Sequence, residues 1–403
     1  MYDAIVVGAR VAGSATAIYL AKFGYQVLLV DKDTFPSFTL SSHLFWARAH
    51  ALFEELGVLE AIEATSAPAL LHHSIETPTR TIQGPLPPVE GHRATRCLRR
   101  EVLDKILIDA AGREPLVDVR EGFRVDELQK EDGRISGIRG HSSKAEGVTE
   151  ESRIVIGADG RNSFVATRVK ARRYDEDPSL RAMYFGYYRD VPLPDPPMAR
   201  ILARPTREFF ILPADDGLTV LAVEFPVKDF EAFKKDHAAN FDRFFREDDR
   251  AKELIGPAVR EGPLYGSAQL EGWYHVPYGL GWALVGDACH YIDPEPAQGI
   301  TNALLTAKLL ARGLDRAWRR EVPEEVALWE YQWERDRELA DMQALIYRRD
   351  EILPPRPVRK AFNRAVASDP ALSRGWLGLY NGATDISEYF SPQHVAQALS
   401  GAD

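Results

Sequence analysis

The fold is decided by residues 2–31, which read YDAIVVGARVAGSATAIYLAKFGYQVLLVD. The apolar run at residues 5–7 predicts a parallel strand that is covered on both faces. Residues 8–13 predict a tight turn into a helix, and residues 27–30 predict a second buried strand that ends at Asp31. This order of strand, turn, helix and strand predicts one βαβ unit of a parallel sheet.

The turn in this unit has the spacing of a dinucleotide-binding loop. Gly8 permits the sharp turn and Gly13 permits close packing of helix and strand, whereas Arg10 stands where the motif has its middle glycine. The helix N-terminus presents free amides and a positive dipole to a pyrophosphate, and we expect the Arg10 guanidinium to assist there. Asp31 follows about 20 residues later, where an acid accepts hydrogen bonds from a ribose diol. We predict dinucleotide binding by Gly8, Arg10, Val11, Ala12, Gly13, Asp31 and Lys32, the alternative being an α/β turn that binds nothing.

Composition narrows the class of protein. The formal net charge of −10 argues against a partner such as nucleic acid or an anionic membrane. No apolar run approaches the roughly 18 residues of a membrane span, and the N-terminus lacks the basic region of a signal peptide. We therefore expect a cytoplasmic protein with no integral membrane segment. Cys97 and Cys289 lie far apart, so neither a disulfide nor a metal site is predicted.

The remaining chain predicts an α/β fold with two further parts. Strand-like runs between turns rich in proline, glycine and aspartate predict an antiparallel sheet. Residues 64–98 lack a clear period and predict irregular structure. We expect a discontinuous Rossmann-type domain with a mixed sheet (1–180 and 265–320), an inserted antiparallel substrate-binding sheet (181–264) and a helical C-terminal region (321–403).

Three later segments carry a family resemblance. Residues 100–104 read REVLD, residues 155–163 read VIGADGRNS, and residues 286–290 read GDACH. With the glycine turn, in this order, they resemble the motifs of the p-hydroxybenzoate-hydroxylase-like superfamily of FAD-dependent oxidoreductases. This superfamily includes group A flavoprotein monooxygenases and geranylgeranyl-reductase-like proteins, and the resemblance covers about residues 2–315.

The resemblance implies FAD as the cofactor. Asp287 would hold the ribityl chain, and the amides of Gly299 and Ile300 would face the N1–C2=O edge of the flavin, where a helix N-terminus stabilises negative charge. Arg100 would lie near the pyrophosphate and Val125 beside the adenine. The other residues that we assign to the cofactor site are His43, Asp159, Gly160 and Pro294.

The resemblance also implies a substrate site between the inserted sheet and the flavin. The candidate lining residues are Trp46, Tyr187, Phe209, Ile211 and Phe225, each with a purely structural role as the alternative. His290 is the candidate catalytic residue, because an unperturbed histidine titrates in the useful range. A structural histidine is the alternative there too.

The implied activity is monooxygenation. NAD(P)H would act as a transient reductant, oxygen would add to form a flavin C4a-hydroperoxide, and an apolar or aromatic small molecule would be hydroxylated or epoxidised. One alternative is a reductase that saturates an isoprenoid-like C=C bond, and another is a non-catalytic flavin-binding protein. Halogenation is disfavoured because the sequence has no Trp-x-Trp-x-x-Pro segment. The charged helices leave a homodimer open.

Overall fold

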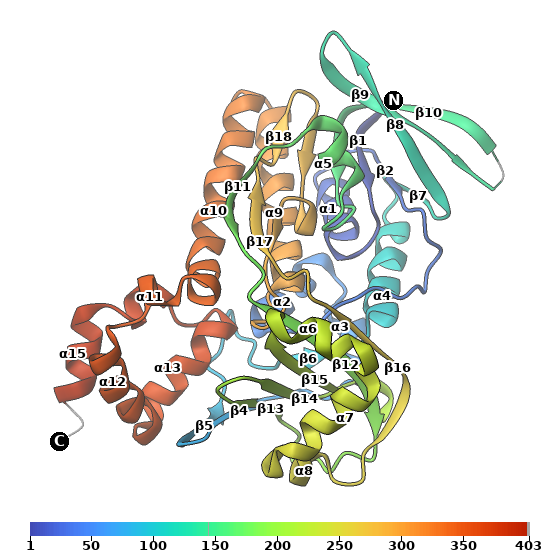
Figure 1. The fold of residues 1–403 in the computed structure, drawn as a ribbon. Helices are drawn as coiled ribbons and strands as arrows, with labels where there is room; N and C mark the ends of the chain where they lie inside the picture. Colours follow the sequence, from blue (N-terminus) through green and yellow to red (C-terminus); the bar gives the residue numbers. More distant parts are fainter. Residues whose placement is uncertain (144, 401–403) are drawn as a thin grey trace.

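A computed structural model describes residues 1–143 and 145–400. Its first sheet surrounds the N-terminus (Figure 1) and has the strand order β18-β19-β10-β1-β2-β7. The strands are β1 (Tyr2–Val7), β2 (Val27–Val30), β7 (Val117–Arg120), β10 (Ala145–Gly157), β18 (Tyr278–Gly279) and β19 (Trp282–Leu284), with β8 (Phe123–Glu131) and β9 (Arg134–Ser142) attached to β10. The central strands are parallel and β18 is antiparallel, which confirms the predicted mixed sheet.

Both faces of this sheet are covered, as its unbroken apolar strands require. Alternate residues such as Ala4 and Val6 pack against helices, and Ile5 and Val7 pack against β8, β9 and a short helix. The covering helices are α1 (Val11–Lys22), α4 (Arg100–Arg113), α9 (Gly299–Trp318) and α10 (Glu324–Tyr347) on one face, and α5 (Phe164–Val169) on the other. The βαβ unit predicted at residues 2–31 is therefore present.

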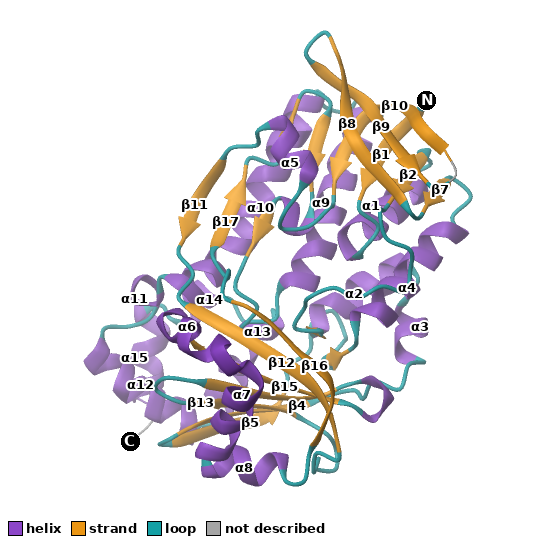
Figure 2. Cartoon of the chain, turned by 45° about the vertical axis from the view of Figure 1, so that its right-hand side comes forward, coloured by secondary structure: helices purple, strands orange, loops and turns teal. Residues whose placement is uncertain are grey.

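A second sheet lies in the other half of the molecule (Figure 2) and has the order β16-β12-β15-β14-β13-β4-β5. Its strands are β4 (His72–Thr77), β5 (Arg80–Pro85), β12 (Arg181–Arg189), β13 (Ala199–Ala203), β14 (Glu208–Pro213), β15 (Thr219–Pro226) and β16 (Val259–Ser267). The expectation of irregular structure over 64–98 is wrong for β4 and β5, which extend this sheet. Since β4 pairs in parallel with β13, the sheet is not wholly antiparallel.

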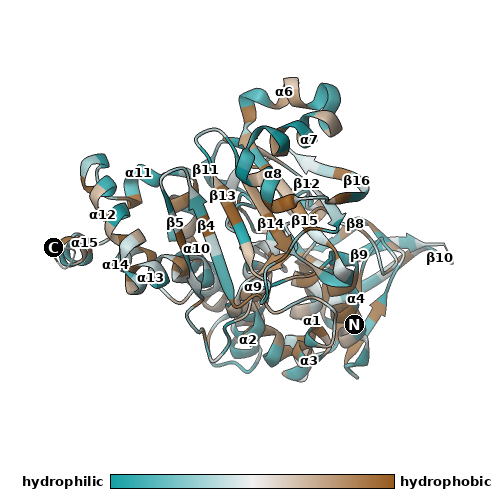
Figure 3. Ribbon diagram, turned by 90° about the horizontal axis from the view of Figure 1, so that it is seen from below, coloured by the Kyte–Doolittle hydropathy of each residue, from teal (hydrophilic) through white to brown (hydrophobic). Residues whose placement is uncertain are grey.

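The outer face of the second sheet is covered by α6 (Phe230–Phe233), α7 (His237–Glu247) and α8 (Asp249–Ile255). In Figure 3 the strands β13, β14 and β15 are apolar, whereas α7 and α8 carry many polar residues. The helix α7 packs Phe241, Phe244 and Phe245 onto the strands, which explains this pattern. The inner face of the sheet is left to face the first domain.

The C-terminal region is helical, as predicted. After α10 it contains α11 (Arg349–Ile352), α12 (Arg356–Ser368), α13 (Pro370–Asn381), α14 (Ile386–Tyr389) and α15 (Pro392–Ser400). Both α12 and α13 pack against β5. The other elements are β3 (Leu44–Phe45), α2 (Ala47–Leu56), α3 (Leu59–Glu63), β6 (Arg96–Cys97), β11 (Arg173–Asp177), β17 (Gly272–His275) and β20 (His290–Tyr291). The strands β11, β17 and β20 form a three-stranded sheet, and β3 pairs with β6. Across the described residues, no helix has the length and apolar character that crossing a membrane requires.

Candidate flavin and substrate site

The turn between β1 and α1 accepts only glycine at two positions. Gly8 has a φ of +101°, and a Cβ there would lie 2.5 Å from the carbonyl oxygen of Ala158. A Cβ on Gly13 would lie 1.7 Å from the carbonyl oxygen of Gly8. These contacts press the start of α1 against the ends of β1 and β10, as a dinucleotide turn requires.

The start of α1 is an open anion site. Its N-cap residue is Arg10, and within the described chain no side chain caps this end and no acid occupies the first turn. The helical hydrogen bonds begin with the amide of Ser14, which donates to the carbonyl of Arg10 at 2.9 Å. The amides of Val11 and Ala12 are therefore available to a phosphate.

Asp31 braces this turn from the end of β2. One carboxylate oxygen accepts a hydrogen bond from the amide of Ala9 at 2.7 Å, and the other accepts one from the amide of Asp33 at 2.9 Å. Burial raises the pKa of Asp31, and the two amides oppose that rise. The carboxylate thus holds the loop in the shape that presents the amides, beside its predicted role toward a ribose.

Arg10 does not point freely toward a phosphate. Its guanidinium pairs with Asp104 at 2.7 Å and with Asp33 at 3.1 Å, and it donates to the carbonyl of Ser37. Arg100 pairs with the same Asp104, at 2.8 Å. Asp104 is fully buried and therefore needs these cations. The expectation that the Arg10 side chain assists the pyrophosphate is thus not supported, and the sequence reasoning gave Asp104 no such role.

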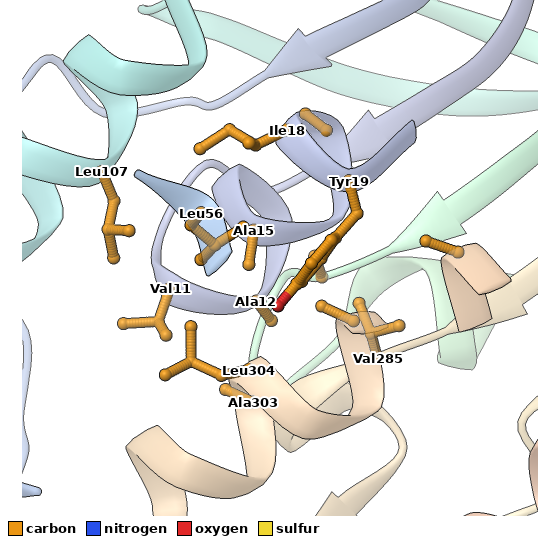
Figure 4. Packing of buried hydrophobic residues seen from close by; sticks show 14 of the residues in the cluster. Val11, Ala12, Ala15, Ile18, Tyr19, Leu56, Leu107, Val285, Ala303 and Leu304 are labelled. Atoms are coloured by element: carbon orange, nitrogen blue, oxygen red, sulfur yellow. The ribbon is translucent and has the colours of Figure 1, made fainter. Parts of the chain in front are cut away.

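A second open helix end lies opposite the first. The helix α9 begins at Gly299, and the amide group of the N-cap residue Gln298 donates to the carbonyls of Pro296 and Tyr380 instead of capping the helix. Figure 4 shows Val11 and Ala12 of α1 packed beside Ala303 and Leu304 of α9. The start of α1 therefore packs against α9 about one turn after α9 begins, and Ile300 is buried in the same core.

Asp287 lies between these helix ends in the short 3-10 turn η4 (Gly286–Ala288). A Cβ on Gly286 would lie 2.7 Å from the Cβ of Ala12, which shows how closely η4 approaches α1. Desolvation raises the pKa of Asp287 to about 6, while the charges of Arg100 and Arg161 lower it. Arg161 is a nearby cation that the sequence reasoning did not select.

A cavity lies under the inner face of the second sheet. Its walls are mostly apolar, and they come from the sheet, from the segment before α2 and from the loop before α9. The lining residues are Ser42, Leu44, Trp46, His73, Met183, Phe185, Ala199, Ile201, Phe210, Leu212, Val220, Ala222, Pro294, Glu295 and Ala297. The predicted residues Trp46 and Pro294 are among them.

Comparison with known proteins identifies this arrangement. Residues 1–343 match the model of a family described as "FAD binding domain". The chain belongs to this FAD-binding family. A pyrrole-carbonyl carrier-protein brominase of Pseudoalteromonas luteoviolacea is 25% identical over 325 residues, covering 75% of this chain and 74% of the relative. A kynurenine 3-monooxygenase of Salinispora arenicola is 28% identical over 415 residues, covering 93% and 86%.

Solved structures share the fold of this FAD-binding protein. The flavin-dependent brominase Bmp2 superposes with a TM-score of 0.82 and 19% identity, covering 100% of this chain and 99% of that one. PqsL of Pseudomonas aeruginosa gives 0.72 and 19%, covering 93% and 98%. The family model and the relatives confirm the predicted superfamily, FAD as cofactor and the class of FAD-dependent monooxygenase, with flavin-dependent halogenases as a related branch.

The geometry of the site fits FAD. The two open helix ends at Val11 and Gly299 suit a pyrophosphate and an electron-rich ring edge, respectively. The carboxylates of Asp31 and Asp287 stand beside one end each, where they would accept hydrogen bonds from the ribose and ribityl hydroxyl groups. Gly8 and Gly13 have no side chain at the first end, so the backbone of this turn can approach a phosphate closely. Each residue's contact with FAD stays a prediction.

The other residues predicted to bind the cofactor lie in the turn before α5, after β2 and on β8. Asp159 accepts hydrogen bonds from the Ser163 hydroxyl at 2.5 Å and the Val165 amide at 3.1 Å, so its carboxylate is used at the start of α5. Gly160 has a φ of +77° in the adjoining turn. Lys32 is exposed beside Asp31, and Val125 is half-buried on β8. We therefore assign Asp159 to supporting the turn rather than to touching FAD.

His43 and Tyr187 form a buried pair beside the cavity. The Tyr187 hydroxyl lies 2.9 Å from His43 Nε2, and His43 Nδ1 has no hydrogen-bond partner among the described residues. Burial lowers the pKa of His43 to about 3, and the charges of Arg100 and Arg99 act in the same direction. The imidazole is therefore neutral, and its free nitrogen is suited to a polar edge of a bound group.

Three predicted substrate residues face away from the cavity. Phe209, Ile211 and Phe225 belong to the core under α6–α8, where Phe209 lies 4.9 Å from Phe245 and Phe225 lies 4.5 Å from Phe233 between ring centroids. Both faces of β14 and β15 are apolar, so alternation alone does not reveal which face meets the cavity. The neighbours Phe210, Leu212 and Ala222 line the cavity instead.

His290 is buried and contacts α10 and β17. Its Nε2 is hydrogen-bonded to the side-chain oxygen of Gln343 at 2.8 Å, and its ring lies 4.4 Å from that of Tyr274. Burial lowers the pKa of His290 to about 3, which favours a neutral imidazole. His290 Nδ1 is buried and has no hydrogen-bond partner among the described residues. The contact of Nε2 with α10 favours the structural alternative, and the catalytic role of His290 stays a prediction.

Neighbouring phenylalanines provide a matched test of which sheet face binds ligand. Phe210→Ala is expected to lower the affinity for ring compounds by about tenfold, because it removes part of the cavity wall. Phe209→Ala is expected to lower the free energy of unfolding by about 3–5 kcal/mol while leaving that affinity unchanged. Ligand titrations followed by flavin absorbance, with urea unfolding, check both. A Phe209→Ala protein that loses ligand affinity as Phe210→Ala does would contradict the assignment.

Proposed function

We propose that this protein uses NAD(P)H to reduce FAD and oxygenates an aromatic or apolar small molecule held in the cavity. The single observation that carries the proposal is the mainly apolar cavity whose wall includes Pro294 and Ala297, immediately before the open end of α9. Relatives named as monooxygenases support the same reaction. An apolar wall suits a substrate with a ring or hydrocarbon body.

The chain's own residues orient the reactants and exclude water. Trp46 donates a hydrogen bond to the carbonyl of Pro296 at 2.8 Å and so fixes the loop that forms one cavity wall. The amides at the start of α9 stabilise negative charge on a ring edge placed against them. FAD, when bound, supplies the redox and oxygen chemistry. The side chains of Phe185 and Phe210 line the cavity and exclude water from the space where the substrate would lie.

NAD(P)H is proposed as a transient reductant, because the sequence contains one dinucleotide turn and the family resemblance implies no second one. A cytoplasmic location is part of the proposal, since NAD(P)H is supplied there. We also keep a homodimer as a proposal, with the charged C-terminal helices as its surface.

Halogenation is the second candidate, because a brominase is 25% identical over 325 residues. The lining of the cavity argues against it. No lysine of the described chain lines the cavity, and the sequence lacks the Trp-x-Trp-x-x-Pro segment.

Oxygen uptake tests the proposed reaction. The FAD-loaded protein is mixed with NAD(P)H and a panel of phenols, indoles and prenyl compounds, with and without bromide, under labelled oxygen gas. We expect a substrate-dependent rise in oxygen uptake and a product that gains one labelled oxygen atom. A gain of two hydrogens would indicate the reductase, a gain of bromine would indicate the halogenase, and flavin that NAD(P)H never reduces would indicate a binding protein. Each of these outcomes overturns the proposal.

A further inference from the structure

Four acidic side chains form a cluster that reaches the cavity at Glu295, and we call them the acidic end. They are Glu208 on β14, Glu224 on β15, and Asp293 and Glu295 in the loop before α9. Glu208 and Glu224 are directly opposite each other in the sheet, one row beyond Phe210 and Ala222 of the cavity wall. Met183 is opposite Glu224 and lines the cavity, as does Glu295 itself. Glu208 and Glu224 therefore lie on the same face of the sheet as the apolar wall of the cavity.

Two arginines only partly balance this charge. Arg181 Nε lies 3.4 Å from an oxygen of Glu224 and 3.5 Å from an oxygen of Asp293. Arg349 Nη2 lies 3.9 Å from an oxygen of Glu295. None of these three contacts has hydrogen-bond geometry. Four carboxylates thus share two guanidinium groups at distances longer than those of a well-formed ion pair.

Several buried atoms of the acidic end lack a partner. Among the described residues, both oxygens of Glu224, Oδ2 of Asp293 and Oε2 of Glu295 accept no hydrogen bond, and Arg181 Nε and Nη2 donate none. The Glu224 side chain is 1% exposed, and that of Glu295 is 6% exposed. Buried polar groups in folded proteins are almost always hydrogen-bonded. A cluster of unpartnered oxygens that reaches the cavity wall at Glu295 therefore indicates a ligand with hydrogen-bond donors.

We propose that the substrate is an aromatic or apolar amine, whose protonated amino group binds Glu224 and Glu295 while its apolar body lies against Phe210 and Trp46. This inference rests on the proposed function of the cavity. An ammonium group offers three donors and one positive charge, which matches unpartnered oxygens in a group of four acids that faces two arginines. A carboxylate ligand would bring a further acceptor and a negative charge to a group of four acids, and a plain hydrocarbon would leave the oxygens unpartnered.

Protons occupy this end when no amine is bound. Burial raises the pKa of Glu208 to about 8 and raises that of Glu224 well above its usual range, and nearby carboxylates add to both rises. The charged and titratable groups facing them are Arg181, Asp293, Glu295, Arg349, Tyr347 and Tyr380. An amine must displace these protons, so its affinity should rise as pH increases from about 6.5 to about 8.5, where an alkylamine is still charged.

A charge series of ring compounds tests the inference. Tryptamine (cation), tryptophol (neutral) and indole-3-propionate (anion), with the matching phenyl series, are titrated into FAD-loaded protein without NAD(P)H, and flavin absorbance and heat are measured. We expect the amines to bind at least about tenfold more tightly than the alcohols, and the acids to bind most weakly. Amine affinity should also increase with pH, whereas alcohol affinity should not.

Two variants assign the effect to the acidic end. Glu295→Gln and Glu224→Gln are each expected to reduce the preference for amines about fivefold or more and to leave alcohol affinity unchanged. Glu261→Gln, on the exposed part of β16, is the matched control and should change neither. Equal affinity across the series, absence of binding by every amine, or an unchanged preference in Glu295→Gln would overturn the inference. Because no turnover is needed, such a failure is separate from failure of the oxygen-uptake test.

Discussion

Gly13→Ala is expected to purify without flavin. A Cβ at this position would lie 1.7 Å from the carbonyl oxygen of Gly8, so α1 must move away from β1. That movement displaces the amides of Val11 and Ala12 from the phosphate position. We expect FAD affinity to fall by about 100-fold or more, roughly 2.8 kcal/mol. Flavin absorbance of the purified protein and titration with FAD measure this change.

The control for this variant is Gly84→Ala. A Cβ on Gly84 would meet no described atom within 4 Å, and this residue has no positive φ, so the same added methyl group should leave FAD content unchanged. Circular dichroism separates loss of cofactor from loss of fold. If folded Gly13→Ala keeps FAD as the native protein does, the glycine turn is not the phosphate site.

Asp104→Asn is expected to produce the largest loss of stability among single polar substitutions near the site. The fully buried carboxylate pairs with Arg10 at 2.7 Å and with Arg100 at 2.8 Å. An asparagine in its place offers no charge and turns an NH₂ group toward a guanidinium. We expect the free energy of unfolding to fall by about 3 kcal/mol, with weaker FAD binding because both arginines border the site. Urea unfolding and FAD titration measure the two effects.

Asp109→Asn on the same helix is the matched control. Asp109 is exposed, and among the described residues its ion-pair partner is Lys105, one turn earlier. A pair of this kind contributes little, so the change should stay within about 0.5 kcal/mol. Asp104→Asn protein that is as stable as the Asp109→Asn protein would show that the buried carboxylate does not organise the two arginines.

The cofactor half of the molecule was predictable because its signals are local. The apolar strands, Gly8, Gly13 and the terminal Asp31 lie within one short segment, and each has a backbone or hydrogen-bonding reason to be where it is. The helix α9 was predictable from its length and periodicity.

The substrate half was less predictable because its signals depend on tertiary packing. Phe209 and Phe210 are adjacent and both apolar, so only the position of α6–α8 decides which one faces the cavity. The strands β4 and β5 are rich in polar residues and are stabilised by pairing with β13 rather than by their own pattern. The acidic end joins residues from separate strands and a loop, and nothing in the sequence places them together.

The most direct test of the central claim compares two flavins. Native protein stripped of cofactor is titrated with FAD and with FMN, which lacks the adenosine half. If α1, Asp31 and α9 hold the two halves of one molecule, FAD should bind with a stoichiometry of one, and FMN should bind at least about 100-fold more weakly. Equal affinity for the two flavins, or no binding of FAD, would contradict the claim.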